Sequence, residues 1–209
     1  MNEEQRMAEV EKFKNYFSYI NRPGADKLLA WLEEAGFFTA PASTKYHGAY
    51  AGGLVEHTNH VYERLVRLTE DEDNRRYKMH KEYNYPEYAV DAIAVVALLH
   101  DVCKADAYKQ KVTGLCCPHK TAEEKVYWTY TNNLPLGHGE KSVIQIMRFM
   151  QLTEEEMLAI RWHMGAFDCA VKGGSGDMNN AFAGSRLAVM LHIADMMATH
   201  LDERKGKCQ

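Results

Sequence analysis

Apolar side chains recur every three or four residues through most of the chain, which is the pattern of amphipathic α-helices. The first two predicted helices cover 3–20 and 25–35, and the helix-breaking sequence Asn21-Arg22-Pro23-Gly24 separates them. Further helices are predicted at about 53–69 and 86–101. A helix that begins within 134–142 is predicted to run to about 151, and two more are predicted at about 153–163 and 182–203. The charged stretch 70–85 predicts a solvated loop or a frayed helix end, and 165–180 predicts a flexible loop.

One region, residues 105–133, departs from the helical period. Residues 126–131, Val-Tyr-Trp-Thr-Tyr-Thr, are rich in strand formers, and Asn132-Asn133 is a turn signal. We therefore predict a small β-hairpin around 125–133 in an otherwise all-α fold. The 209 residues are predicted to form a single domain, with 1–37 as an N-terminal helical extension packed on it.

The segment from Ala89 to Leu99 is apolar nearly all round, which is typical of a helix buried in a domain core. It is about half the length that spans a bilayer, so no membrane segment is predicted. The segment ends in His100-Asp101, with Lys104 three residues further on. A nitrogen and a carboxylate oxygen therefore lie together at the end of the core helix.

Composition narrows the setting in which these residues work. The N-terminus is polar and charged, so it does not resemble a signal peptide. The five cysteines are odd in number and follow no pattern, which favours reduced thiols in a cytoplasmic protein. The net charge of −4 gives no general attraction to nucleic acid or to anionic lipid.

Candidate metal ligands occur in otherwise apolar surroundings on several predicted helices. They are His57, the pair His100-Asp101, His163 and Asp195, together with His138 at a glycine-flanked helix start. A carboxylate placed among Leu, Ile and Met, as Asp195 is, is costly unless a cation neutralises it. A divalent metal would satisfy this carboxylate and the apolar-set histidines together.

The ligand types indicate which metals are compatible. Imidazoles mixed with carboxylates suit Mn, Fe, Co, Ni or Zn, with Mg also open, and the absence of a cysteine pair at ligand spacing argues against structural zinc. Asp101 has two oxygens and could bridge two ions. Two ions about 3.5–4 Å apart are a standard device for phosphoester hydrolysis, so one or two ions are expected.

The order His57, His100-Asp101, Asp195 in a helical context resembles the HD-domain metal-dependent phosphohydrolase superfamily, over about 38–203. Residues 46–58, Tyr-His-Gly-Ala-Tyr-Ala-Gly-Gly-Leu-Val-Glu-His-Thr, look like the entry to the HD domain of bacterial 3′–5′ exoribonucleases. Residues 100–104, His-Asp-Val-Cys-Lys, resemble the His-Asp-x-x-Lys motif of those enzymes and of HD-GYP cyclic-dinucleotide phosphodiesterases.

The resemblance implies an HD-domain helical bundle in which His57, His100, Asp101 and Asp195 hold one metal. In two-metal members two further histidines lie between the His-Asp pair and the final Asp, and His138 and His163 occupy that order here, with Asp101 bridging. Lys104 would contact the scissile phosphate. A one-metal site, with His138 and His163 as structural or substrate-contacting groups, stays open.

For several other residues a purely structural role is an alternative to a functional one. His47 either packs in its turn or lines the pocket as a substrate-binding group, and Lys104 on its own is also compatible with a plain helix-end lysine. His60 is assigned to the surface or to an outer position near the ligands, and His192 and His200 are assigned structural roles.

Two departures limit what the resemblance implies about substrate. The exoribonucleases carry a nucleic-acid-binding domain before the HD domain, whereas only about 40 helical residues precede it here. The glycine-rich signature of the HD-GYP group is also missing. We therefore expect a metal-dependent phosphohydrolase, a phosphodiesterase or nucleotidase that uses a metal-activated hydroxide on a nucleotide or small phosphodiester rather than on long nucleic acid. The alternative is a nucleotide-binding or sensor module that retains metal with little turnover.

Overall fold

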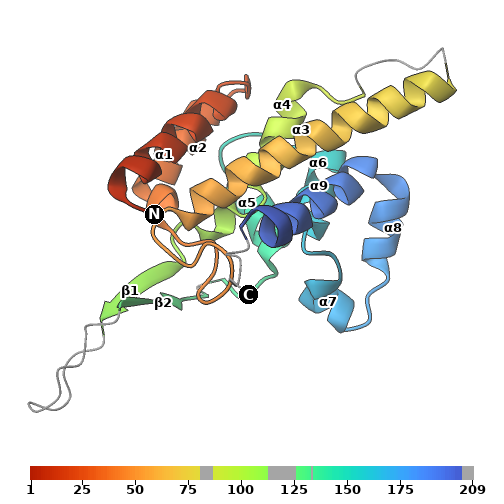
Figure 1. Cartoon of the computed structure of the whole chain (residues 1–209). Helices are drawn as coiled ribbons and strands as arrows, with labels where there is room; N and C mark the ends of the chain where they lie inside the picture. The colour runs from red at the N-terminus through yellow and green to blue at the C-terminus, as the bar shows by residue number, and fades with distance from the viewer. Residues whose placement is uncertain (81–86, 113–125, 133, 204–209) are drawn as a thin grey trace, which may run out of the picture.

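The computed structural model describes residues 1–80, 87–112, 126–132 and 134–203 (Figure 1). It is 66% helix and 4% strand, which confirms the predicted all-α fold with a small hairpin. The longer helices are α1 (Glu3–Phe17), α2 (Ala25–Glu34), α3 (Gly53–Met79), α4 (Val90–Leu99), α5 (His138–Met147), α6 (Glu154–Trp162), α8 (Asp177–Gly184) and α9 (Arg186–Met197). Short elements are α7 (Cys169–Lys172) and the 3₁₀ turns Phe37–Thr39, Val102–Lys104 and Gly165–Phe167.

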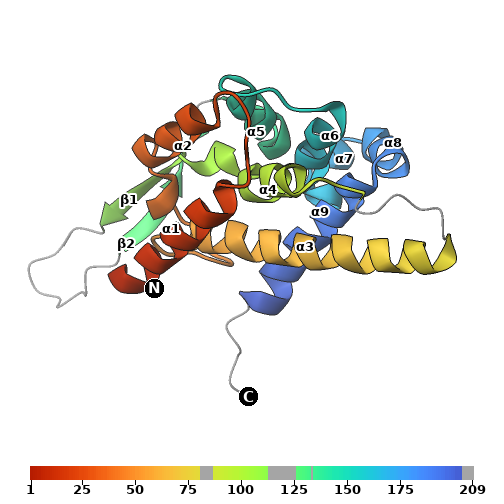
Figure 2. The ribbon, with the colours of Figure 1, turned by 90° about the horizontal axis from the view of Figure 1, so that it is seen from above.

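The core is organised around α4, which packs against α1, α3 and α6 (Figure 2). Its last seven residues, Ile93 to Leu99, are all buried, as expected of a helix that is apolar on every face. The N-terminal helices close one end of this core through an aromatic cluster in which the ring of Phe13 lies 5.3 Å from the rings of both Phe37 and Phe38. The end of α4 therefore delivers His100 and Asp101 into the interior.

The start of α6 shows how local sequence fixes an element. The Thr153 hydroxyl accepts a hydrogen bond from the Glu156 N–H at 3.2 Å, and the Glu156 carboxylate accepts one from the Thr153 N–H at 2.8 Å. These two hydrogen bonds form a capping box, which fixes the start of α6. Arg22, in the turn between α1 and α2, also pairs with the buried Glu156 carboxylate. One carboxylate thus caps α6 and connects it to the N-terminal helices.

Several predicted boundaries are wrong. The first helix ends at Phe17. For residues 70–85 the prediction was a solvated loop or a frayed helix end, and the stretch as far as Met79 is the continuation of α3. Ion pairs on exposed helix faces, such as Arg75 Nη2 to Glu72 Oε2 at 2.8 Å, stabilise a helix without an apolar stripe. Residues 81–86, where the rest of that loop and the start of the next helix were predicted, lie outside the described residues.

The predicted loop at 165–180 is also wrong in part, because it contains α7 and the first half of α8. Asp168 caps α7 by accepting a hydrogen bond from the Ala170 N–H at 2.8 Å. The last predicted helix begins later than expected, at Arg186, and beyond Met197 it continues as a π turn, Ala198–Asp202.

The hairpin pairs β1 (Tyr108–Val112) with β2 (Val126–Tyr130) in an antiparallel register that places Tyr108 opposite Tyr130. Its second strand agrees with the predicted strand, whereas its first strand lies well before the predicted range around 125–133. Asn132 follows the sheet instead of turning it, and Asn133 lies outside the described residues. Figure 1 shows the hairpin projecting from the helical body. Tyr108 begins β1 and Tyr130 ends β2, so the two paired tyrosines lie at the base of the hairpin.

Within the described ranges, no helix is long and apolar enough to cross a membrane. Cys103 and Cys169 are free thiols, as predicted, and Cys116, Cys117 and Cys208 lie outside the described residues.

Candidate metal centre

A cavity of about 750 Å³ opens where the hairpin base, the end of α4, the start of α5 and the helix α9 meet. All the predicted site residues line it except His100, which is fully buried behind it. These lining residues are His47, His57, Asp101, Lys104, His138, His163 and Asp195. Residues up to about 150 positions apart in the sequence are therefore brought together in one hollow.

The first group of donors joins α3, α4 and α9. One donor atom each from His57, His100 and Asp195 lie within 4.8 Å of one another, a spacing that could hold a metal ion. His57 Nε2 is 3.3 Å from Asp195 Oδ1. The sequence suggested a buried Asp195, and its side chain keeps 16% exposure because it faces the cavity.

The second group is centred on Asp101, with His100 and His163 on either side. His100 Nε2 lies 3.4 Å from Asp101 Oδ2, and His163 Nε2 lies 3.5 Å from Asp101 Oδ1. Both separations exceed the usual length of an N–H···O hydrogen bond. The three side chains are almost fully buried, and their donor atoms also lie within 4.8 Å of one another. Asp101 thus presents one oxygen to each histidine.

The ring orientations of these histidines are set by the backbone. His100 Nδ1 lies 2.8 Å from the Ala97 carbonyl, and His163 Nδ1 lies 2.7 Å from the Ile160 carbonyl. A carbonyl can only accept, so each Nδ1 carries a proton, and in the neutral ring each Nε2 keeps a lone pair that can bind a metal. Backbone carbonyls orient metal-binding histidines in this way in many proteins.

The same atoms lack hydrogen-bond partners. Among the described residues, the buried Nε2 atoms of His100 and His163 and the Oδ1 atom of Asp101 accept and donate no hydrogen bond. Buried polar atoms are seldom left unpaired, because each one costs the free energy of its lost hydration. These three atoms converge, and all can act as lone-pair donors, so they fit a metal cation.

A third group contains a residue that sequence reasoning had not singled out as a ligand. Donor atoms of Asp101, Cys103 and His138 lie within 4.8 Å of one another. The Cys103 sulfur is 3.6 Å from His138 Nδ1, so the thiol contacts the ring edge that carries this nitrogen. Burial is the main cause that raises the pKa of Cys103 to about 11, which keeps it a neutral thiol at pH 7.

The charged side chains of the donor groups shift one another's pKa values. Burial opposes protonation of His57, but Glu203 and Asp195 outweigh it and raise the pKa of His57 to about 10. Burial also favours neutral carboxyls, yet Lys104 and His100 hold the pKa of Asp101 well below its usual value. Likewise His57 lowers the pKa of Asp195 despite burial. The carboxylates are therefore ionised, as metal ligands must be.

Lys104 is more deeply placed than a lysine at a plain helix end. Its Nζ donates to Asp101 Oδ2 at 2.6 Å and to the Ala42 carbonyl at 2.9 Å. Burial opposes its charge, but the adjacent Asp101 outweighs this and raises the pKa of Lys104 above its usual value. The ammonium group is therefore a fixed positive charge on the cavity wall.

The other walls are aromatic and weakly polar. Tyr108 and Tyr130 line the cavity from the hairpin base, with ring centroids 5.5 Å apart, and Tyr130 lies 5.9 Å from His138. His47 also lines it, and its pKa falls to about 4, mainly through burial and then through His57 and Lys104. His47 is therefore a neutral imidazole at pH 7.

Two further residues at the site were missed or assigned only a structural role. Glu203 lies beside His57, and nothing in the polar end of the chain pointed to it. His192 was expected to be structural; it lines the cavity while its Nδ1 lies 2.6 Å from the His163 carbonyl. Its ring fits there because Gly165 has no Cβ, which would lie 2.4 Å from the ring. The spacing of His192 three residues before Asp195 was the one available signal.

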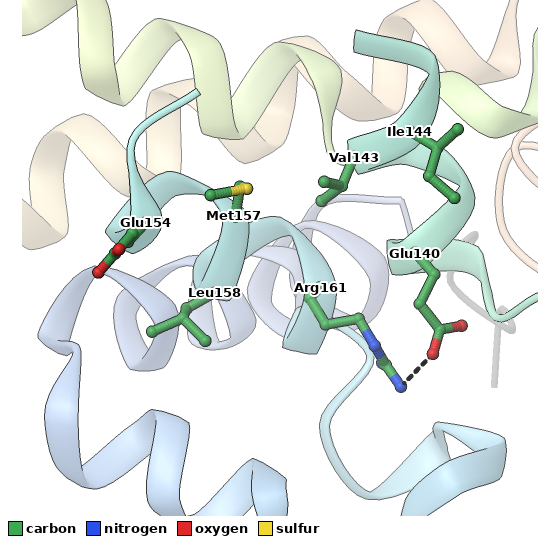
Figure 3. A pocket seen from close by; sticks show the side chains of 7 residues that line it. All are labelled: Glu140, Val143, Ile144, Glu154, Met157, Leu158 and Arg161. Carbon is green, nitrogen blue, oxygen red and sulfur yellow. Dashed lines mark ion pairs between the residues drawn. The ribbon is translucent and has the colours of Figure 1, made fainter. Parts of the chain in front are cut away.

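A second hollow, of about 480 Å³, lies between α5 and α6 and is lined mainly by apolar side chains (Figure 3). Its polar edge is the ion pair of Arg161 Nη2 with Glu140 Oε1 at 2.8 Å. Among the described residues, no predicted ligand lines this groove. The groups that can carry out chemistry are in the larger cavity.

Comparison of the chain with protein-family models, with curated proteins and with solved structures returned no match.

Proposed function

We propose that the protein is a metal-dependent phosphohydrolase of the HD-domain type that acts on a nucleotide or small phosphodiester. One observation carries this proposal. In the part of the chain that the structure describes, His100 Nε2, His163 Nε2 and Asp101 Oδ1 are buried, close together and without hydrogen-bond partners. Bound divalent cations would satisfy these atoms, either as one ion that takes all three or as two ions that share Asp101.

The resemblance to HD domains implies how ions would be held. His57, His100, Asp101 and Asp195 would bind one ion, and Asp101, His138 and His163 would bind a second with Asp101 as the bridge. A single ion with His138 and His163 as substrate contacts remains the alternative. Imidazole and carboxylate ligands suit manganese, iron, cobalt, nickel or zinc, and magnesium is open.

When bound, such ions activate water at neutral pH and neutralise phosphate oxygens. The side chains of this protein would contribute the rest of the chemistry. Lys104 has three N–H donors, and two of them are used by Asp101 and Ala42. The third is available for a phosphate oxygen and would stabilise the negative charge that develops on phosphorus oxygens. His47, as a neutral imidazole, would offer a hydrogen bond without adding charge.

The size and lining of the cavity support the substrate class. A volume of about 750 Å³ lies in the range of small-molecule sites. Its cationic Lys104 and metal-ligand cluster suit a phosphate, and the tyrosines of the hairpin base suit the flat apolar surface of a base. The net charge of −4 does not favour a long polyanion.

The test is to strip the full chain of metal, add back Mn²⁺ and assay bis-p-nitrophenyl phosphate, p-nitrophenyl phosphate and a panel of nucleotides. We expect metal-dependent turnover of at least one substrate, lost in Asp101→Asn. Elemental analysis of the same preparation gives the number of ions per chain, and one ion would assign His138 and His163 to other roles. Bound metal without turnover on any substrate would favour the second candidate, a metal-retaining nucleotide sensor.

A further inference from the structure

Glu203 lies just beyond the last helical turn, yet its side chain is almost completely buried, with 2% exposure. Its Oε1 atom is 2.9 Å from His57 Nδ1 and 3.3 Å from His60 Nδ1. Its Oε2 atom is also buried and has no hydrogen-bond partner among the described residues. A donor atom of His47 also lies within 4.8 Å of donor atoms of His57 and Glu203, so this buried carboxylate is surrounded by three imidazoles.

The contact fixes the state of the His57 ring. Glu203 is an almost fully buried carboxylate whose Oε1 lies at hydrogen-bond distance from His57 Nδ1. An ionised carboxylate only accepts hydrogen bonds, so the proton of the neutral ring lies on Nδ1. When a metal replaces the proton that Nε2 shares with Asp195, the lone pair lies on Nε2, the atom that faces Asp195 in the first donor group. His57 is thus aligned for a metal by a carboxylate on its opposite edge.

The backbone before Glu203 is arranged to reach this position. The Glu203 N–H donates to the Ala198 carbonyl, five residues earlier, at 3.1 Å, which closes the π turn Ala198–Asp202. A π turn holds an extra residue, so the residues after it face roughly 100° away from their α-helical direction. The preceding residue, Asp202, accepts a hydrogen bond from Arg64 Nε at 2.8 Å, which holds the same turn against α3.

We propose that Glu203 is a positioning residue for the metal centre, which holds His57 in its Nδ1-protonated form and strengthens Nε2 as a ligand. The proposal rests on the function proposed above. Carboxylates that accept the second ring proton of a ligating histidine raise its basicity and fix its orientation. His60 shares the same oxygen and steadies the carboxylate from a second side.

The test compares four forms of the metal-stripped full chain: wild type, Glu203→Ala, Glu203→Gln and Asp202→Asn. Mn²⁺ alone is titrated into each by calorimetry. We expect Glu203→Ala to weaken binding about 10–100-fold, and Glu203→Gln to weaken it less because its amide oxygen still accepts the ring proton. Asp202→Asn removes one carboxylate charge next to Glu203 but keeps an oxygen that accepts the Arg64 hydrogen bond, so the turn is retained and affinity should change by no more than about twofold.

A second measurement reads the ring directly. Proteins labelled with ¹⁵N-histidine and loaded with Zn²⁺ should show His57 protonated at Nδ1 in the wild type and in Glu203→Gln, with that proton lost or fast-exchanging in Glu203→Ala. Circular dichroism and melting temperature identify any variant that has lost its fold.

Three outcomes would overturn the proposal: unchanged Mn²⁺ affinity in Glu203→Ala, an equal loss in Asp202→Asn, or a wild-type chain that binds no metal. The last would overturn the proposed function as well. Weakened binding in Glu203→Ala, in a wild-type protein that binds metal and hydrolyses none of the phosphate esters, would support the role of Glu203 while removing the proposed enzyme activity.

Discussion

The two ends of the donor cluster present the same ligand type with different support. At one end a carboxylate, Glu203, lies 2.9 Å behind His57. At the other a neutral thiol, Cys103, lies 3.6 Å behind His138. A carboxylate is a strong acceptor and adds negative charge, whereas a thiol is a weak acceptor. Two sites built from the same ligand types can therefore differ in metal affinity, because the residues behind their histidines differ. We expect the His57 end to bind metal more tightly.

Removing the residue common to both ends should have the largest effect. Asp101→Asn keeps the shape but removes the charge between His100 and His163. Loss of a residue that only supports a metal ligand costs about 10–100-fold in metal affinity. Loss of Asp101 itself should therefore weaken Mn²⁺ binding and reduce turnover by more than that. Calorimetry and the phosphodiester assay measure both. Asp106→Asn, an exposed aspartate of the same segment, is the control. Activity that survives in Asp101→Asn would refute the mechanism.

Substitutions at the two ends should then separate them. His57→Ala should abolish the tighter binding event, with a loss of more than about 100-fold. His138→Ala should leave that event within about tenfold and remove only a weaker second ion. Calorimetric stoichiometry and elemental analysis distinguish the cases. Equal losses in both variants would mean that the ends are not different in strength.

Metal should also stabilise the fold, through the tighter end first. A ligand at 100 times its Kd contributes about 2.7 kcal/mol. For a chain of this size that corresponds to a rise of roughly 5–10 °C in Tm. Thermal melts with Mn²⁺ and with EDTA measure the rise, and His57→Ala should lose most of it. If Mn²⁺ does not change the melting temperature of the wild type, the folded protein has no metal site of this affinity.

The smallest expected effect concerns the thiol. Cys103→Ala removes the contact with His138 Nδ1, so the second ion should bind more weakly by about tenfold or less, while the first is unchanged. A fit of two-site calorimetric data resolves the two events. Cys169→Ala, an exposed free cysteine, controls for general effects of thiol loss. A loss at the first site equal to that at the second would contradict the assignment of Cys103 to His138.

The sequence predicted the candidate metal ligands better than the residues that support them and the boundaries of the elements that carry them. His57, His100, Asp101, His163 and Asp195 stood out because polar donors on apolar helix faces must find partners inside the fold.

Glu203 had no such signal, since it follows a polar helix end and reaches His57 only through a π turn that local propensity does not encode. The first hairpin strand was missed for a similar reason. Tyr108–Val112 contains two lysines and a glutamine, and its strand conformation depends on pairing with β2.

The ammonium group of Lys104 has a consequence for the life of the protein in the cell. Because it already pairs with Asp101 at 2.6 Å, the fold contains its own counter-charge. The chain should therefore leave the ribosome and reach its final shape without waiting for an ion, unlike small domains that fold only on metal. Under the proposed function, newly made protein would be folded before it binds metal, and its activity would then follow the supply of the metal.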